Sequence, residues 1–159
     1  MDNEREFEKR SFVEELGLFF EQSGMPRMAG RILGWLLLSD PPHQSLNELA
    51  EALIASKGSI STTTRLLVQI GLIERISLPG VRHGYFRIRP SASQHLLKQG
   101  AEQVTILRKL AERGLELLEA KASLTRQGLE EMRDMYAFFE GEYPALLERW
   151  EQERAKRQS

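Results

Sequence analysis

The sequence predicts a mainly α-helical chain with one small β-hairpin, and three observations support this. Residues 45–70 hold two short amphipathic segments on either side of a Ser-Lys-Gly turn signal. Two runs with period-two alternation, 73–78 and 85–89, follow directly. The flanking residues, 1–40 and 91–159, carry helical periodicity instead. This order predicts a winged helix-turn-helix over residues 41–90, between long N-terminal and C-terminal helices.

Composition narrows the class of protein further. With 159 residues, the chain has room for one domain, or for a small domain with an oligomerisation appendage. It has no cysteine, which excludes disulfides and cysteine nucleophiles and fits a cytoplasmic protein. The longest apolar stretch, residues 32–38, is far shorter than the ~20 residues that cross a bilayer. We therefore expect no membrane partner.

The net charge of −1 conceals an uneven distribution of charge along the chain. Residues 41–100 hold seven basic and three acidic side chains. Residues 1–40 hold five and eight, and residues 101–159 hold ten and twelve. A basic centre in a mildly acidic chain suits localised contact with phosphates.

The first forty residues predict two helices. Residues 1–11 are charged and lack periodicity, so we expect a frayed start that becomes helical near Phe12. Apolar side chains then recur at helical spacing, and they are Phe12, Leu16, Phe19 and Phe20. Gly24 and Pro26 mark the end of this helix, and a second helix is expected from Pro26 to Leu38.

The helix-turn-helix itself carries capping signals. Ser45 with Glu48 three residues later forms a capping-box pattern, which predicts a helix that begins after Ser45. Gly58 is expected in the turn, and Ser59 is expected to cap a second helix that runs to Ile70.

The outward face of this second helix is unusually polar and contains the candidate DNA-binding residues. Ser61, Thr62, Arg65 and Gln69 share this face, and Lys57, Ser59 and Thr63 complete the candidate set. Arginine can bind guanine bidentately and glutamine can bind adenine, while short hydroxyl side chains let a helix approach DNA closely. The wing adds Arg82 and His83 at its tip, where an adjacent minor groove attracts cations, and Arg87 on its second strand. The alternative for these residues is an ordinary solvated helix face and hairpin tip.

The last third of the chain predicts a dimerisation surface. Apolar residues are spaced three and four apart, as in a heptad seam, and they are Leu129, Met132, Tyr136, Phe139, Tyr143, Leu146 and Trp150. Such a narrow stripe cannot build a core alone, so it is expected to pack on another helix or another subunit. We assign residues 91–159 to dimerisation, with Phe12 and Leu16 contributing from residues 1–40. Pro144 predicts a kink or a break in the seam.

The segments Ser56-Lys-Gly-Ser-Ile-Ser-Thr-Thr-Thr-Arg-Leu-Leu, Ile-Gly-Leu-Ile-Glu-Arg and Tyr-Phe-Arg-Ile-Arg-Pro90 resemble the MarR family of bacterial winged-helix regulators, and more narrowly its GbsR-type branch. The resemblance implies an obligate homodimer that binds a pseudo-palindromic operator in double-stranded DNA. Wings of this family often carry an acid two positions before a tip arginine. Pro79-Gly-Val81-Arg82 has no such acid.

The resemblance also implies a small-molecule effector pocket between the DNA-binding lobe and the dimer helices. Its candidate residues are Phe19, Met25, Met28, Trp35, Met132 and Tyr136. Adaptable methionines and aromatic walls suit apolar or cationic ligands, although core packing explains the same pattern.

No cofactor or metal site is predicted, because His43, His83 and His95 are scattered and no catalytic motif is visible. An enzyme is therefore the weakest of three hypotheses. The first is a sequence-specific transcriptional regulator, a dimeric and effector-responsive repressor. The second is a winged-helix interaction module that docks a protein partner through its heptad helices.

Overall fold

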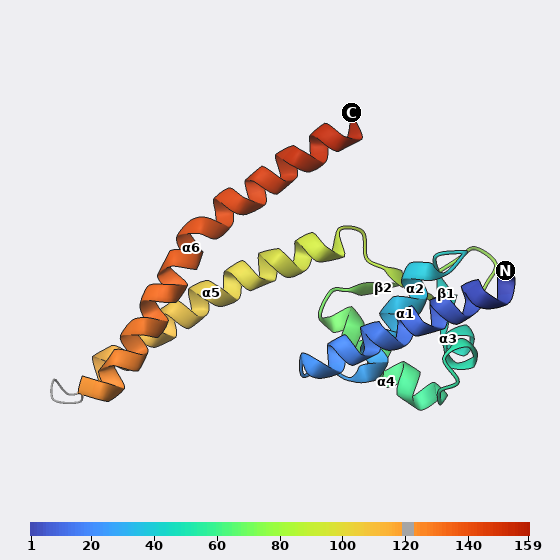
Figure 1. Ribbon diagram of the computed structural model, residues 1–159, viewed down its shortest axis with the longest axis horizontal. Helices are drawn as coiled ribbons and strands as arrows, with labels where there is room; N and C mark the ends of the chain where they lie inside the picture. The colour runs from blue at the N-terminus through green and yellow to red at the C-terminus, as the bar shows by residue number, and fades with distance from the viewer. Residues whose placement is uncertain (119–122) are drawn as a thin grey trace. The chain divides into compact units, whose positions relative to one another are not determined.

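The structure, a computed structural model, describes residues 1–118 and 123–159 (Figure 1). The chain forms two units, Met1–Ser93 and Gln94–Ser159. The first unit contains four helices and a small sheet, and the second consists of two long helical segments. The mainly helical class with a small β wing is confirmed.

Two N-terminal helices, α1 (Asp2–Gln22) and α2 (Arg27–Leu38), pack directly on one another. The expected frayed start is wrong, because α1 begins at Asp2. Asp2 and Glu4 lie in its first turn, where acidic side chains interact favourably with the helix dipole. Pro26 lies at the N-cap position of α2, one residue before the helix begins at Arg27, and makes no side-chain capping hydrogen bond.

Glycine brings α1 and α2 into close approach. A Cβ atom built on Gly30 would lie 2.2 Å from the backbone oxygen of Leu16, so only glycine fits there. Leu16 itself is partly buried against the core of its own chain. Its side chain is therefore already used in the packing of α1, which weakens its predicted role in dimerisation.

The helix-turn-helix consists of α3 (Leu46–Ala52) and α4 (Lys57–Gln69). The capping box at Ser45 is confirmed in both directions, at 3.1 Å from Glu48 N to Ser45 Oγ and 2.6 Å from Ser45 N to Glu48 Oε2. The predicted start of α4 is wrong, because Ser56 caps the helix by accepting a hydrogen bond from Ser59 N. Gly58 lies inside the helix.

The turn between these helices therefore spans residues 53–56. Ile54 in this turn has φ 50°, an uncommon conformation for a β-branched residue, and its side chain is 86% exposed. Arg31 of α2 stabilises the turn by donating a hydrogen bond of 2.9 Å to the backbone oxygen of Leu53. The same guanidinium pairs with Glu14 of α1 at 2.8 Å. Arg31 thus connects α1 to the helix-turn-helix.

The wing is part of a three-stranded antiparallel sheet in the order β1-β3-β2. Strands β2 (Ile73–Ile76) and β3 (Tyr85–Ile88) are shorter than predicted, because the pairing ends before Leu78 and Arg89. The third strand, β1 (Gln44–Ser45), was not predicted. Its two residues are too few for an alternation pattern, and it pairs Ser45 with Tyr85.

One core connects the N-terminal helices with the helix-turn-helix and the sheet. Its buried residues are Val13, Ala29, Ile32, Leu33, Leu36, Leu49, Ala50, Leu53, Ile60, Leu67, Ile73 and Phe86. Residues 1–40 and 41–90, which the sequence analysis separated, therefore share one hydrophobic core.

The second unit is formed by α5 (from Ala92, in the first unit, to Leu117) and α6 (Ser123–Gln158). Polar pairs connect them: Arg108 with Glu140, and Gln94 with Glu151 at 2.6 Å. Arg108 donates hydrogen bonds to Glu140 and to Glu112. Both raise the pKa of its guanidinium above the usual value, and the bond to Glu140 contributes more. Leu129 at the start of the predicted seam packs on α5, because its Cδ1 lies 3.0 Å from the position of a Cβ on Gly114.

Pro144 lies inside α6, which is assigned as one helix through it. Of the two outcomes predicted at Pro144, a kink or a break, the break is therefore not observed. Figure 1 shows α6 as a single ribbon that bends in its orange-to-red part, as a proline within a helix favours. Within residues 1–118 and 123–159, no helical segment combines the length and the hydropathy that a membrane span requires.

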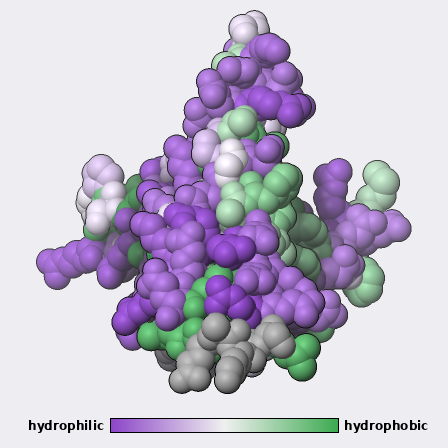
Figure 2. Space-filling model, turned by 90° about the vertical axis from the view of Figure 1, so that its left-hand side faces the viewer, coloured by the Kyte–Doolittle hydropathy of each residue, from purple (hydrophilic) through white to green (hydrophobic). Residues whose placement is uncertain are grey.

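Much of the apolar surface of the second unit is exposed. Its buried hydrophobic residues, among those described, are Ala111 and Leu115. Leu124 is 84% exposed, Phe138 63% and Leu146 57%. Figure 2, which views the end where α5 and α6 approach each other, shows green apolar side chains at the surface among purple hydrophilic ones.

Candidate nucleic-acid interface

Helix α4 exposes a polar face built from the predicted residues. Lys57, Thr62, Arg65 and Gln69 are exposed or half-buried, as are Ser59 and Ser61. Opposite this face, Ile60 and Leu67 are fully buried and fix the helix on the core. The polar face is therefore held outward by the packing of the other side.

Thr63 is a correction to the predicted set. Its side chain is buried, and its hydroxyl donates a hydrogen bond of 2.8 Å to the backbone oxygen of Ser59. Thr64 is buried likewise and donates to Ile60 O at 2.8 Å. Positions 60, 63, 64 and 67 form one inward stripe at helical spacing, a signal that was present in the sequence.

The wing tip holds one exposed arginine and a cluster of rings. Arg82 is exposed and makes no hydrogen bond or ion pair with a residue that the structure describes. His83 Nε2 lies 3.2 Å from the Tyr85 hydroxyl. His43 packs edge-on against the same tyrosine, with ring centroids 5.1 Å apart. The ring cluster anchors the tip beside β1, with Arg82 extending from it.

The two faces of the wing differ in charge. On one face, Arg87 forms an ion pair with Glu74, at 2.6 Å from Nη2 to Oε1. On the other face lies Arg75, which pairs in register with the buried Phe86. Arg75 lies outside the predicted set of DNA-binding residues, although the sequence also allows it to contact the DNA backbone.

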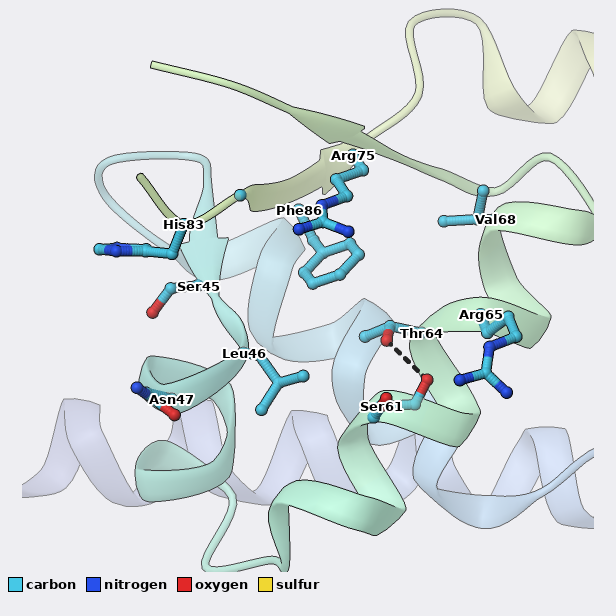
Figure 3. A pocket seen from close by; sticks show the side chains of 11 residues that line it. Ser45, Leu46, Asn47, Ser61, Thr64, Arg65, Val68, Arg75, His83 and Phe86 are labelled. Atoms are coloured by element: carbon cyan, nitrogen blue, oxygen red, sulfur yellow. Dashed lines mark hydrogen bonds between the residues drawn. The ribbon is translucent and has the colours of Figure 1, made fainter. Parts of the chain in front are cut away.

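A cavity of about 430 Å³ separates α4 from the wing (Figure 3). Leu46, Val68 and Phe86 provide its apolar surface, and hydroxyls of Ser45 and Ser61 provide polar edges. Figure 3 shows Arg75 and His83 from the wing and Arg65 from α4 around it. The cavity is therefore lined by basic side chains from both parts of the winged helix.

The candidate effector residues fall into different units. Met25, Met28 and Trp35 are partly buried against the core of the first unit, while Phe19 is exposed. Among the described residues, the Trp35 indole nitrogen is buried without a hydrogen-bond partner. Met132 and Tyr136 belong to the second unit. No group of three or more His, Asp or Glu side chains in the described ranges is placed to hold a metal ion.

A helix-turn-helix with a polar, outward second helix and an arginine-bearing wing is a DNA-binding architecture. The fold and the site thus define a winged-helix DNA-binding protein.

Comparison with known proteins gives the family. The chain is 43% identical over 141 residues to the HTH-type transcriptional regulator MmpR5 of Mycobacterium tuberculosis, covering 89% of this chain and 86% of that protein. It is 30% identical over 77 residues to the putative HTH-type transcriptional regulator YvaV of Bacillus subtilis, covering 48% and 43%. A crystal structure described as a transcriptional regulator matches with TM-score 0.80 and 42% identity, over 91% of this chain and 99% of that one.

A profile described as "MmpR5-like MarR family transcriptional regulator" matches residues 91–153. The chain belongs to this MmpR5-like group of the MarR family of transcriptional regulators. It is therefore a DNA-binding regulator, and neither the interaction-module hypothesis nor the enzyme hypothesis is supported.

Proposed function

We propose that this regulator binds a pseudo-palindromic operator as a homodimer, with one α4 helix in each of two successive major grooves. Such helices lie about 34–36 Å apart, one turn of DNA. The observation that carries the proposal is the exposed polar face of α4 beside an arginine-bearing wing. Among the described residues, Lys57, Arg65 and Arg82 form no ion pair within the chain, so their charge is available to DNA.

The proposed contacts divide into base and phosphate contacts. Arg65 and Gln69 are long enough to reach base edges, and Ser61 and Thr62 allow the helix to come close. Lys57 and Ser59, at the start of α4, bind backbone phosphate. Arg82 enters the adjacent minor groove, and His83 supports it from the wing. Arg87 is the least favoured of the predicted residues, because Glu74 already neutralises it.

The second unit supports the dimer part of the proposal. Phe139, Leu146 and Trp150 of the predicted seam are exposed in the single chain. Apolar surface of this kind is stabilised when a second subunit removes it from water. We propose that Leu129, Met132, Tyr136 and Tyr143 complete the same seam, and that Phe12 and Leu16 of α1 make separate dimer contacts.

We further propose that the regulator is a cytoplasmic repressor that a small molecule releases from DNA. The support for an effector is the buried Trp35 indole N–H, a donor without a partner among the described residues. Met25 and Met28 are also partly buried against the core of this unit. An effector acts only if it binds one spacing of the two α4 helices more tightly than the other. We also propose the finer assignment to the GbsR-type branch, which rests only on the resemblance of the helix-turn-helix and wing sequences.

The test is binding to DNA from upstream of the protein's own gene, measured by fluorescence anisotropy against scrambled DNA over a salt series. We expect saturable, preferred binding whose log affinity falls linearly with log salt. Arg65→Ala should lower specific affinity by about 1–3 kcal/mol and relax specificity. A matched control is Glu51→Gln, an exposed change on α3 away from the α4 face. Absence of binding to either DNA at low salt would overturn the proposal.

A further inference from the structure

We propose that Arg75, on the face of the wing that is turned toward α4, binds a backbone phosphate of operator DNA. The inference rests on the proposed function, and it concerns a residue outside the predicted set. Four features carry it: the register of the wing, the space over Gly84, the charges on the two faces of the hairpin and the cavity beside α4.

The register of the sheet determines where Arg75 points. In the antiparallel pair, Arg75 lies opposite Phe86, and Ile73 lies opposite Ile88. Residues opposite one another share a face of a sheet, so these four side chains lie on the same side. Ile73 and Phe86 of this set are buried in the core. Arg75 therefore lies on the same face of the hairpin as the buried residues. It is the polar residue of this face and lines the cavity next to α4.

The position of the guanidinium depends on Gly84. A Cβ atom built on Gly84 would lie 2.3 Å from Arg75 Nε and 3.1 Å from Arg75 Cζ. The side chain thus crosses the hairpin from β2 and occupies the space that any larger residue at position 84 would need. Figure 3 shows the guanidinium beside the Phe86 ring at the edge of the cavity. Glycine at 84 therefore leaves the space that the Arg75 guanidinium occupies.

The charges on the hairpin distinguish Arg75 from its neighbour on the other face. Arg87 is held by Glu74 at 2.6 Å, so much of its charge is already compensated. Arg75 makes no hydrogen bond or ion pair with any residue in the described part of the chain. The pocket between α4 and the wing contains no carboxylate among its lining residues, all of which lie in the described ranges. An anion is therefore the chemical group that this side of the wing attracts.

The surroundings favour a DNA phosphate as that anion. Arg65 of α4 lines the same cavity, with hydroxyls of Ser45 and Ser61. When a helix occupies the major groove, the backbone of the flanking strand passes between that helix and the wing. Arginine binds phosphate through paired, charge-assisted hydrogen bonds. Arg75 then contributes affinity that is independent of base sequence.

The experiment compares Arg75→Gln with Arg87→Gln in the full-length protein, on operator and on scrambled DNA, over a salt series. Arg75→Gln should weaken binding to both DNAs by about tenfold, with unchanged preference between them. It should also reduce the slope of log affinity against log salt by about 0.9. Arg87→Gln removes the same charge from the other face and should change affinity by less than about threefold. Equal effects of the two variants would overturn the proposal.

Two further variants test whether Gly84 positions Arg75. Gly84→Ala should displace Arg75 and reproduce its loss of affinity, and the double variant Gly84→Ala with Arg75→Gln should be no weaker than Arg75→Gln alone. Additive losses would show that Gly84 acts by another route and would contradict the positioning role. Circular dichroism melting of each variant controls for folding.

Free phosphate is the other anion that could bind in this cavity in place of a DNA phosphate. We expect inorganic phosphate to displace operator DNA no better than chloride does at equal ionic strength. If phosphate displaced DNA from the wild-type protein but not from Arg75→Gln, the cavity would be a free-anion site and the proposal would be wrong. If Arg65→Ala and Arg75→Gln both left affinity unchanged, the proposed interface of α4 with DNA would fail as well.

Discussion

The two units of this chain differ in how much of their apolar surface is buried within the single chain. The first unit, Met1–Ser93, buries a continuous core that includes Ile32, Leu36 and Leu67. In the described part of the second unit, only Ala111 and Leu115 are buried hydrophobic residues. Large side chains such as Leu124 and Phe138 stay exposed. The first unit therefore has a core of its own, whereas the second exposes apolar surface that the proposed dimer covers.

This difference agrees with the separate roles proposed for the two units, DNA recognition for the first and dimerisation for the second. DNA recognition needs side chains held at fixed positions, and the core of the first unit fixes α4 and the wing. In the proposed dimer, the exposed apolar surface on the helices of the second unit pairs the two chains. Substitutions in the first unit should change stability at any protein concentration, whereas those in the second should act through assembly.

The largest effect is expected in the core of the first unit. Leu36 is 2% exposed, so Leu36→Ala removes buried methyl groups and leaves a cavity. It should lower the free energy of unfolding by about 2–5 kcal/mol. Urea denaturation followed by circular dichroism at two protein concentrations measures it. Leu37→Ala, at an exposed neighbouring position, is the control and should change stability little. A small loss for Leu36→Ala would contradict a packed core around α2.

The second effect is expected in the seam of α6. Leu146 is 57% exposed, and Leu146→Asp places a charge where a partner's apolar surface is proposed to pack. The dissociation constant of the dimer should rise about hundredfold, which corresponds to ~2.7 kcal/mol. Analytical ultracentrifugation over a concentration series measures it. Ala145→Asp, one exposed residue earlier on the same helix, is the matched control. Equal dissociation by both variants would argue against a seam at Leu146.

A smaller effect is expected where α1 meets the helix-turn-helix. Arg31 is bonded to Glu14 and to the backbone oxygen of Leu53. Arg31→Met keeps much of the length but removes both polar contacts, so stability should fall by about 1–3 kcal/mol. Hydrogen exchange should show faster opening of residues 53–56. Arg27→Met, which loses only an exposed contact with Glu14 at 3.1 Å, is the comparison. Unchanged exchange in the turn would show that Arg31 does not hold it.

The smallest effect is expected on the surface of the wing. Glu74 and Arg87 form an exposed ion pair, with 34% and 45% of their side chains accessible. Water and salt screen such a pair, so Glu74→Gln should change stability by less than ~1 kcal/mol. Thermal melting at low and high salt measures it. A larger loss that persists at high salt would show that Glu74 has a structural role beyond the ion pair.

Much of the first unit follows from local signals in the sequence. The capping box at Ser45 and the alternation around Phe86 predicted α3 and the hairpin, because caps and periodicity depend on near neighbours. The start of α4 was placed too late, since Ser56 and Ser59 are both acceptable caps. Strand β1 was missed because its two residues pair with β3 far along the chain.

The candidate site was predictable only in part. The outward positions of Arg65 and Gln69 follow from helical spacing, but Thr63 was assigned to the wrong side of α4. The contrast between Arg75 and Arg87 depends on which face of the hairpin is turned toward α4, and this is set by tertiary packing. Sequence alternation separates two faces without telling which one is inner.

The central claim, that the first unit recognises DNA and the second joins two chains on it, is tested most directly by changing the spacing of an operator. Full-length protein should bind the intact operator as a dimer. Inserting about five base pairs between the half-sites should turn one half-site to the opposite side of the DNA and reduce affinity to that of a single half-site. Inserting about ten should restore part of it. Affinity that is the same for all three DNAs, measured by anisotropy, would contradict the claim.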